Sequence, residues 1–279
     1  MNGRPTRRSR ISPQLSAATD KRGGSNRVRP TYEARTRRPY ERLVSPADAG
    51  RALSGPAFST REQRLIARLR TPVAAQQYLN RLPYNNEPGG RATLRSFRGV
   101  VRHGCAHCLE AALFAAVVLE PHGYPPLVLS FESIDALDHV IFVYRENGRW
   151  GSVARSRDPG LHGRRPLFAT PRALALSYVD PYVDFTGRIT GYAVIDLRMM
   201  GDYNWRLADT NVWKVERMLL DYPHRPIASS DRRVNWLRAR YRAFRAAYPG
   251  RKPLQYRGRE RWTELPPEFN PSRNLEWVS

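Results

Sequence analysis

The sequence predicts an α+β fold in which a central buried helix packs on an antiparallel sheet, followed by a helical extension at the C-terminus. The segment 108–119 is apolar on nearly all sides, which is typical of a helix at the centre of a fold rather than on its surface. The apolar runs 139–144 and 150–154 flank Asn147-Gly148, and this pattern is the strongest short-range signal for a β-hairpin.

The other elements follow from capping residues and apolar spacing. Ser59 or Thr60 can cap a first helix, Pro72 suits the first turn of a second, and Gly123 ends the central helix. Apolar residues on one face predict a helix from Ser59 (Leu65, Ile66, Leu69), a helix from Pro72 (Val73, Tyr78, Leu79) and a helix over 231–247 (Val234, Leu237, Tyr241, Phe244). Further helices are predicted over 94–101, 108–119, 171–178 and 211–220. Strands are predicted over 127–131, 139–144, 150–154 and 189–197.

The charge of the chain is strongly basic. The 279 residues include 47 Lys and Arg against 25 Asp and Glu, a formal charge of +22. Residues 1–57 alone hold 13 basic and 4 acidic residues with many Pro, Gly and Ser, so we expect a disordered basic tail. Such a tail is either an inert, solvated extension or a non-specific contact for nucleic acid. The domain expected after it spans 58–225, with the helical extension over 226–279.

The cysteine content and the lengths of the apolar runs indicate the compartment and whether the chain spans a membrane. Cys105 and Cys108 lie three residues apart, which is no disulfide framework and indicates a reducing compartment or a catalytic thiol. No apolar run approaches the roughly 20 residues that span a bilayer, and the N-terminus lacks the apolar region of a secretory signal. We therefore expect a cytoplasmic protein with no membrane span.

Cys108 and His139 are the candidate nucleophile and base. A thiol at a helix N-terminus has a lowered pKa, because unpaired N–H groups and the helix dipole favour the thiolate. His139 opens a strand of an otherwise apolar hairpin. Counting back from the Asn147-Gly148 turn pairs His139 with Ser156, which makes Ala154 and Asp158 its diagonal neighbours on the same face. Asp158 is therefore the candidate that orients the imidazole.

These motifs resemble the core of the transglutaminase-like superfamily, which has a papain-like Cys–His–Asp site. The resemblance rests on residues 108–111 (Cys-Leu-Glu-Ala), 138–140 (Asp-His-Val) and 148–150 (Gly-Arg-Trp), and it covers 104 to about 160. It implies that Cys108 attacks an amide of a protein, peptide or related substrate and that His139 moves the proton. The family's Asp, expected four residues after the hairpin Trp, is Ala154 here; Asp158 or Ser156 takes its place, or the triad is incomplete.

Other interpretations remain open at the level of sequence. Cys108 can be a structural core residue, because cysteine is among the most buried residue types. Cys105, His107 and Cys108, together with His103, can instead form a metal site, although the second pair of ligands typical of zinc is missing and we expect no cofactor. The two competing classes are a transglutaminase-like scaffold without catalysis and a basic protein associated with nucleic acid.

Overall fold

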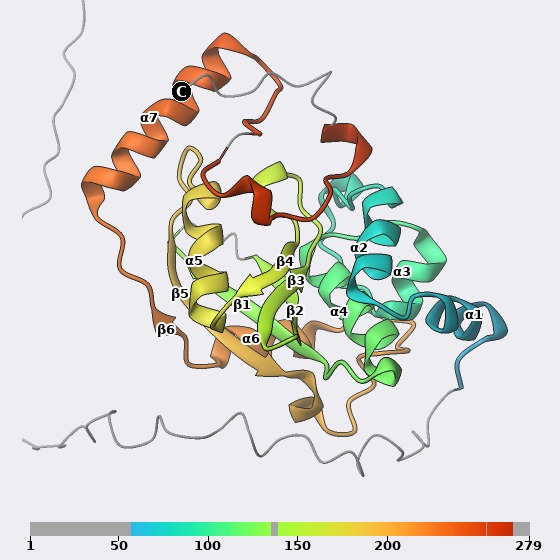
Figure 1. Cartoon of the computed structure of the whole chain (residues 1–279). Helices are drawn as coiled ribbons and strands as arrows, with labels where there is room; N and C mark the ends of the chain where they lie inside the picture. The colour runs from blue at the N-terminus through green and yellow to red at the C-terminus, as the bar shows by residue number, and fades with distance from the viewer. Residues whose placement is uncertain (1–56, 135–138, 255, 270–279) are drawn as a thin grey trace, which may run out of the picture. The chain divides into compact units, whose positions relative to one another are not determined.

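A computed structural model describes residues 57–134, 139–254 and 256–269 (Figure 1). The predicted basic tail, apart from residue 57, lies outside these ranges. In the described residues the chain is a mixture of helices and one sheet of six strands, ordered β4-β3-β2-β1-β5-β6, in which every neighbouring pair is antiparallel. The predicted α+β class with an antiparallel sheet is confirmed.

The described elements follow the predicted order with two additional short strands, β4 and β6. The strands are β1 (Leu127–Ser133), β2 (Val140–Glu146), β3 (Arg149–Val153), β4 (Arg164–Phe168), β5 (Ile189–Asp196) and β6 (Arg225–Pro226). The α-helices are α1 (Thr60–Arg68), α2 (Pro72–Arg81), α3 (Phe97–His103), α4 (Cys108–Leu119), α5 (Pro171–Tyr182), α6 (Trp213–Asp221) and α7 (Asp231–Ala247). The 3-10 turns are η3 (Pro88–Gly90), η4 (Glu120–His122), η5 (Pro159–Leu161), η6 (Leu197–Met200), η7 (Arg259–Arg261) and η8 (Pro267–Phe269).

The hairpin of β2 and β3 has the predicted register. Glu146 pairs with Arg149 and Tyr144 with Gly151, and the ladder ends at the pair Phe142–Val153. Both turn residues have positive φ, 48° at Asn147 and 73° at Gly148, which is the left-handed geometry that an Asn-Gly turn supplies. The hairpin thus fixes where β2 begins, one residue after His139.

The sheet is covered on both faces, and α4 forms the centre of one of them (Figure 1). Every residue of α4 after Cys108 is buried, as the apolar sequence predicts. Phe114 of α4 stacks on Tyr78 of α2 with ring centroids 5.1 Å apart and lies 5.4 Å from the Phe97 ring of α3. On the opposite face α5 packs on Phe131 through Tyr178. Two cores therefore hold the sheet between them.

Local capping explains where α3 begins. The structure starts this helix at Phe97, three residues later than the sequence predicts, because the Ser96 hydroxyl accepts a hydrogen bond from the Gly99 N–H and caps it there. Leu94 lies outside the helix, and its N–H donates to the Asn211 side chain at 3.0 Å.

The segment after α7 returns to the sheet. Trp262 forms an isolated antiparallel bridge with Arg164 at the start of β4. The Thr263 N–H donates to the Gly163 carbonyl at 3.2 Å, and Asn80 of α2 donates to the Glu264 carbonyl at 2.9 Å. This C-terminal segment therefore contacts the loop between β3 and β4 at Gly163.

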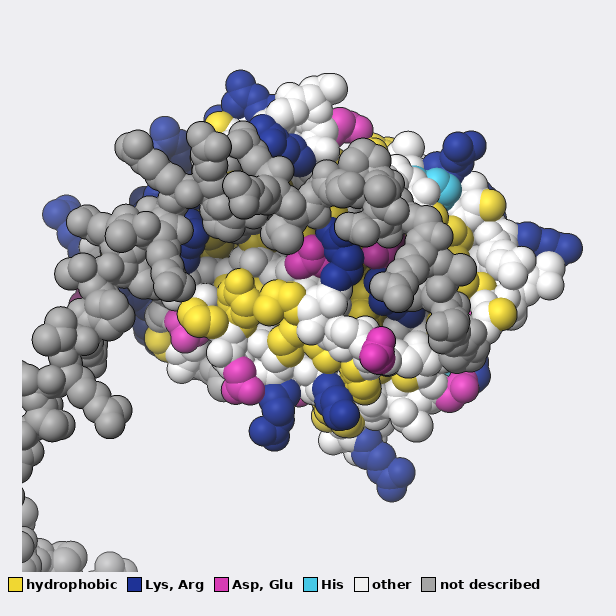
Figure 2. Space-filling view, turned by 90° about the horizontal axis from the view of Figure 1, so that it is seen from below, with side chains coloured by type: hydrophobic (Ala, Val, Ile, Leu, Met, Phe, Trp, Pro, Cys, Tyr) yellow, Lys and Arg dark blue, Asp and Glu magenta, His cyan; other side chains and the backbone are white. Residues whose placement is uncertain are grey.

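The surface reflects the basic composition. On the face seen in Figure 2, Lys and Arg side chains project around the edge, and hydrophobic side chains lie exposed between them. Within the described ranges no helix has the length and apolar character needed to cross a bilayer.

Candidate active site

Cys108 is the first residue of α4, as the sequence predicts, and its side chain is half-buried. Its thiol is hydrogen-bonded to the imidazoles of both His107 and His139. Burial alone favours the neutral thiol, but these two hydrogen bonds and the positive charge of the two rings outweigh it and hold the pKa of Cys108 well below its usual value. The structure therefore brings Cys108 and His139 together, and it adds a second histidine.

His139 is the residue directly before β2, and its side chain is almost fully buried between aromatic rings. Its ring is 6.1 Å from that of Phe131 and 5.9 Å from that of Tyr178, measured between centroids. Its Nε2 lies 2.9 Å from the carbonyl oxygen of Leu161 in η5. A carbonyl only accepts hydrogen bonds, so Nε2 carries a proton and Nδ1 is the nitrogen left for the Cys108 thiol.

Asp158 is not the group on the far nitrogen of His139. Its carboxylate lies 2.6 Å from Nζ of Lys252, and its backbone N–H donates to the Ser156 hydroxyl at 3.1 Å. The Ser156 hydroxyl is thus also engaged away from the ring. The sequence predicts a carboxylate or hydroxyl as the partner of the far nitrogen of His139. In the structure this partner is the Leu161 carbonyl.

The hairpin ends before the residues on which the Asp158 prediction depends. Beyond Val153 the chain leaves β2, because the side chain of Gln76 in α2 takes both backbone groups of Ala154. Its Oε1 accepts from the Ala154 N–H at 2.9 Å, and its Nε2 donates to the Ala154 carbonyl at 2.8 Å. The diagonal relation between His139 and Asp158 assumed an extended ladder, and that ladder stops at Val153.

His107 is the N-cap residue of α4 and is held by Thr93 outside the helix and by Glu110 within it. Its Nε2 donates to the Thr93 carbonyl at 2.8 Å and lies 3.6 Å from Oε1 of Glu110. Burial disfavours the charged ring, but the hydrogen bond to Cys108 and the negative charges of Cys108 and Glu110 raise the pKa of His107 to about 9. A thiolate at Cys108 is therefore flanked by a histidine that favours the protonated form at neutral pH.

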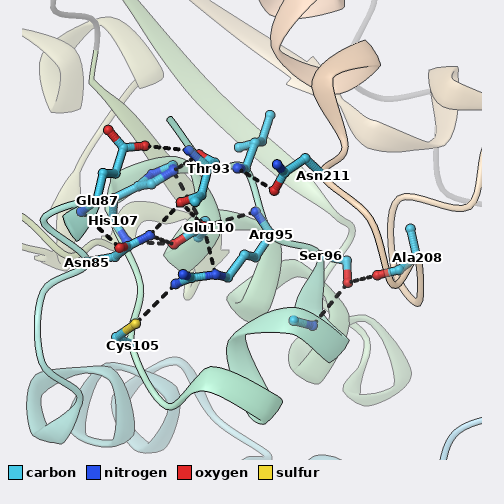
Figure 3. A network of polar contacts seen from close by, with 12 residues as sticks. Asn85, Glu87, Thr93, Arg95, Ser96, Cys105, His107, Glu110, Ala208 and Asn211 are labelled. Atoms are coloured by element: carbon cyan, nitrogen blue, oxygen red, sulfur yellow. Dashed lines mark hydrogen bonds and ion pairs between the residues drawn. The ribbon is translucent and has the colours of Figure 1, made fainter. Parts of the chain in front are cut away.

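Glu110 is a fully buried carboxylate that ties the loop before α3 to the start of α4 (Figure 3). Its Oε1 accepts from the Arg95 N–H at 2.9 Å and the Thr93 hydroxyl at 3.2 Å. Its Oε2 accepts from the His107 N–H and from the Asn85 side chain, both at 3.0 Å. This network fixes the backbone immediately before Cys108.

Cys105 has a different environment from Cys108. Its sulfur accepts a hydrogen bond from the Arg95 guanidinium at 3.1 Å (Figure 3). In the part of the chain that the structure describes, no group of three or more His, Cys, Asp or Glu side chains is arranged to hold a metal ion. The Cys105–Cys108 spacing therefore does not gather a ligand set here.

Tyr84 contacts the same helix start. Its hydroxyl accepts a hydrogen bond from the Cys108 backbone N–H. Burial is the main reason, with the nearby Cys108 charge next, that the pKa of Tyr84 is raised, so the phenol keeps its proton. The N–H that favours negative charge at the start of α4 is thus covered by a hydroxyl group.

Sequence reasoning missed three of these groups. His107 was considered only as a metal ligand, although its place directly before a helix-starting Cys could have marked it. Tyr84 lies far from Cys108 in sequence. The Leu161 carbonyl is a backbone group and leaves no trace in residue type.

Comparison with known proteins gives limited information. No protein-family model matches the chain, and no curated protein matches it. Among solved structures, the chain is similar to calcium-bound LapG from Legionella pneumophila at 13% identity and a TM-score of 0.29, over 63% of this chain and 99% of that one. This similarity is too weak to indicate an activity.

Proposed function

We propose that the chain is a transglutaminase-like cysteine enzyme that transfers or hydrolyses an acyl group of an amide. One observation carries the proposal: the Cys108 thiol begins a buried helix and is hydrogen-bonded to two imidazoles that lower its pKa. A nucleophile in contact with a base, with the base held by a third group, is the arrangement that covalent acyl transfer requires.

The proposed reaction uses the groups in the following roles. Nδ1 of His139 takes the thiol proton, and the Cys108 thiolate attacks the amide carbonyl carbon and forms a tetrahedral intermediate. The negative oxygen of that intermediate accepts a hydrogen bond from the Cys108 N–H, which the Tyr84 hydroxyl gives up. His139 passes a proton to the leaving amine, the C–N bond breaks, and a thioester remains on Cys108. Water or a second amine then attacks the thioester, and His139 takes the proton of this nucleophile. The C–S bond breaks, the acid or new amide leaves, and the proton returns to the Cys108 sulfur.

The substrate proposed is a protein, peptide or related amide, and the compartment proposed is the cytoplasm. The alternative is a scaffold of the same fold without turnover. It is favoured by one observation, namely that a neutral carbonyl rather than a carboxylate lies on Nε2 of His139. In a serine triad, loss of the orienting carboxylate costs about 10⁴ in turnover.

A labelling experiment separates the enzyme from the scaffold. Iodoacetamide at pH 6 is expected to alkylate Cys108 far faster than Cys105, and His139→Ala is expected to remove most of that difference. An acyl donor such as p-nitrophenyl acetate should then leave an acetyl group on Cys108, seen by mass spectrometry and lost with time. Equal and slow alkylation of both cysteines would exclude the enzyme. Selective alkylation without any acyl transfer would favour the scaffold.

A nucleic-acid role for residues 1–57 stays a separate prediction. Binding to random-sequence DNA that weakens steeply with salt, and that disappears when residues 1–57 are deleted, would support it. Binding that persists after the deletion would instead implicate the arginine-rich α7.

A further inference from the structure

Arg164, the first residue of β4, is a fully buried cation. No carboxylate is among its partners within the described ranges; its guanidinium instead donates to backbone carbonyls and to Ser177. Burial lowers the pKa of Arg164 to about 10, which still leaves it charged at neutral pH. A buried charge is expensive unless it is fully hydrogen-bonded, so this arrangement needs a reason.

The carbonyls that Arg164 holds lie on both sides of Leu161. Its two terminal nitrogens donate to the carbonyls of Gly160 and His162, each at 2.6 Å. The carbonyl of Leu161, between them, is the group that lies 2.9 Å from Nε2 of His139. The planar fork of an arginine spans two acceptors in fixed geometry, which a lysine ammonium does not do.

Aromatic rings enclose the guanidinium. Its central carbon lies 4.1 Å from the ring centre of Tyr178 and 4.3 Å from that of Trp262. The Tyr178 hydroxyl donates to the His162 carbonyl at 3.0 Å, so it supports the same segment that Arg164 holds. The Tyr178 ring also packs beside His139.

We infer that Arg164 is a positioning residue for His139: it fixes residues 160–162 so that the Leu161 carbonyl orients the imidazole in place of the family's carboxylate. The inference rests on the proposed function of Cys108 and His139. The carbonyl keeps the proton on Nε2, which leaves Nδ1 to accept the thiol proton. If the Gly160 and His162 carbonyls were released, the Leu161 carbonyl would lose its fixed direction and His139 its tautomer.

The test measures the rate of Cys108 alkylation by iodoacetamide from pH 5 to pH 10, in full-length chains carrying Cys105→Ser. Arg164→Gln is expected to slow alkylation at pH 6 by about tenfold, the effect of one pKa unit, and to approach the unaltered rate at pH 10, where any thiol is ionised. Arg164→Lys is expected not to restore the rate. His139→Ala gives the lower limit, and Arg98→Gln, which breaks the pair with Glu62 at 2.9 Å elsewhere in the fold, controls for general loss of stability.

Each outcome decides the inference. A folded Arg164→Gln chain whose rate at pH 6 stays within about twofold of the unaltered chain would overturn it, even while selective labelling of Cys108 upholds the proposed function. If Arg164→Gln does not fold, Tyr178→Phe keeps Arg164 and removes the second donor to the His162 carbonyl, together with the 2.7 Å hydrogen bond between Tyr178 and the Ser152 hydroxyl. That variant must then slow the reaction at pH 6 in the same direction, and an unchanged rate would overturn the inference.

Discussion

The buried carboxylate of Glu110 is predicted to stabilise the fold and to hold Cys108 in its reactive position. Each of its two oxygens accepts two hydrogen bonds. Glu110→Gln keeps the shape but replaces one oxygen with an amide nitrogen that cannot accept. Two donors then lose their partner, and each unpaired buried donor costs about 1–3 kcal/mol. The free energy of unfolding is therefore expected to fall by about 2–6 kcal/mol, a large share of a typical total.

Urea unfolding followed by circular dichroism measures this loss. Alkylation of Cys108 at pH 6, below the unfolding transition, should also slow, because the network that fixes the backbone before Cys108 loses two of its four hydrogen bonds. Glu62→Gln is the matched control: Glu62 is a buried carboxylate that caps α1 and pairs with Arg98, so it should lower stability and leave the reactivity of Cys108 unchanged. A Glu110→Gln chain as stable as the unaltered one would refute the reasoning.

Three further predictions concern neighbouring groups. His107→Gln removes one of the two imidazoles on the thiol, so the Cys108 pKa should rise and alkylation at pH 6 should slow by about tenfold; an unchanged rate would contradict this role. Burial and the charge of Arg155 hold the pKa of His162 well below its usual value. The His162 ring is therefore protonated near pH 6.5 in the unfolded chain but stays neutral in the folded chain. Stability is thus lost as pH falls below about 6.5, by about 2 kcal/mol at pH 5, and His162→Gln should remove this loss in urea unfolding at pH 7 and pH 5. Gln76→Met leaves both backbone groups of Ala154 unpaired and should cost about 2–6 kcal/mol in the same assay, whereas a neutral result would contradict the hydrogen bonds assigned to it.

The sequence was most informative where one local rule decides the structure. The apolar run of α4 has one solution, a buried helix, and both of its ends were predicted correctly. The Asn147-Gly148 turn fixed the register of the hairpin through the pair Phe142–Val153. These two elements are also the ones that place Cys108 and His139.

The sequence was least informative where distant segments compete for backbone groups. Both backbone groups of Ala154 are hydrogen-bonded to the side chain of Gln76, which lies 78 residues away, and no local sequence pattern predicts this contact. Arginine is a surface residue by type, so the buried position of Arg164 was not predictable. The Leu161 carbonyl acts through its position alone. The third member of the site therefore escaped a prediction that looked for a carboxylate.

The central claim is that Cys108 is a thiolate at neutral pH, stabilised by the imidazoles of His107 and His139. Its most direct test is an absorbance titration of the thiolate near 240 nm in the Cys105→Ser chain from pH 4 to pH 10, with Cys108→Ser in the same background to subtract the tyrosines. The account predicts that Cys108 ionises well below the usual thiol value of about 8.5 and that His139→Ala moves the transition upward. Ionisation at or above about 8.5, unchanged by His139→Ala, would contradict it.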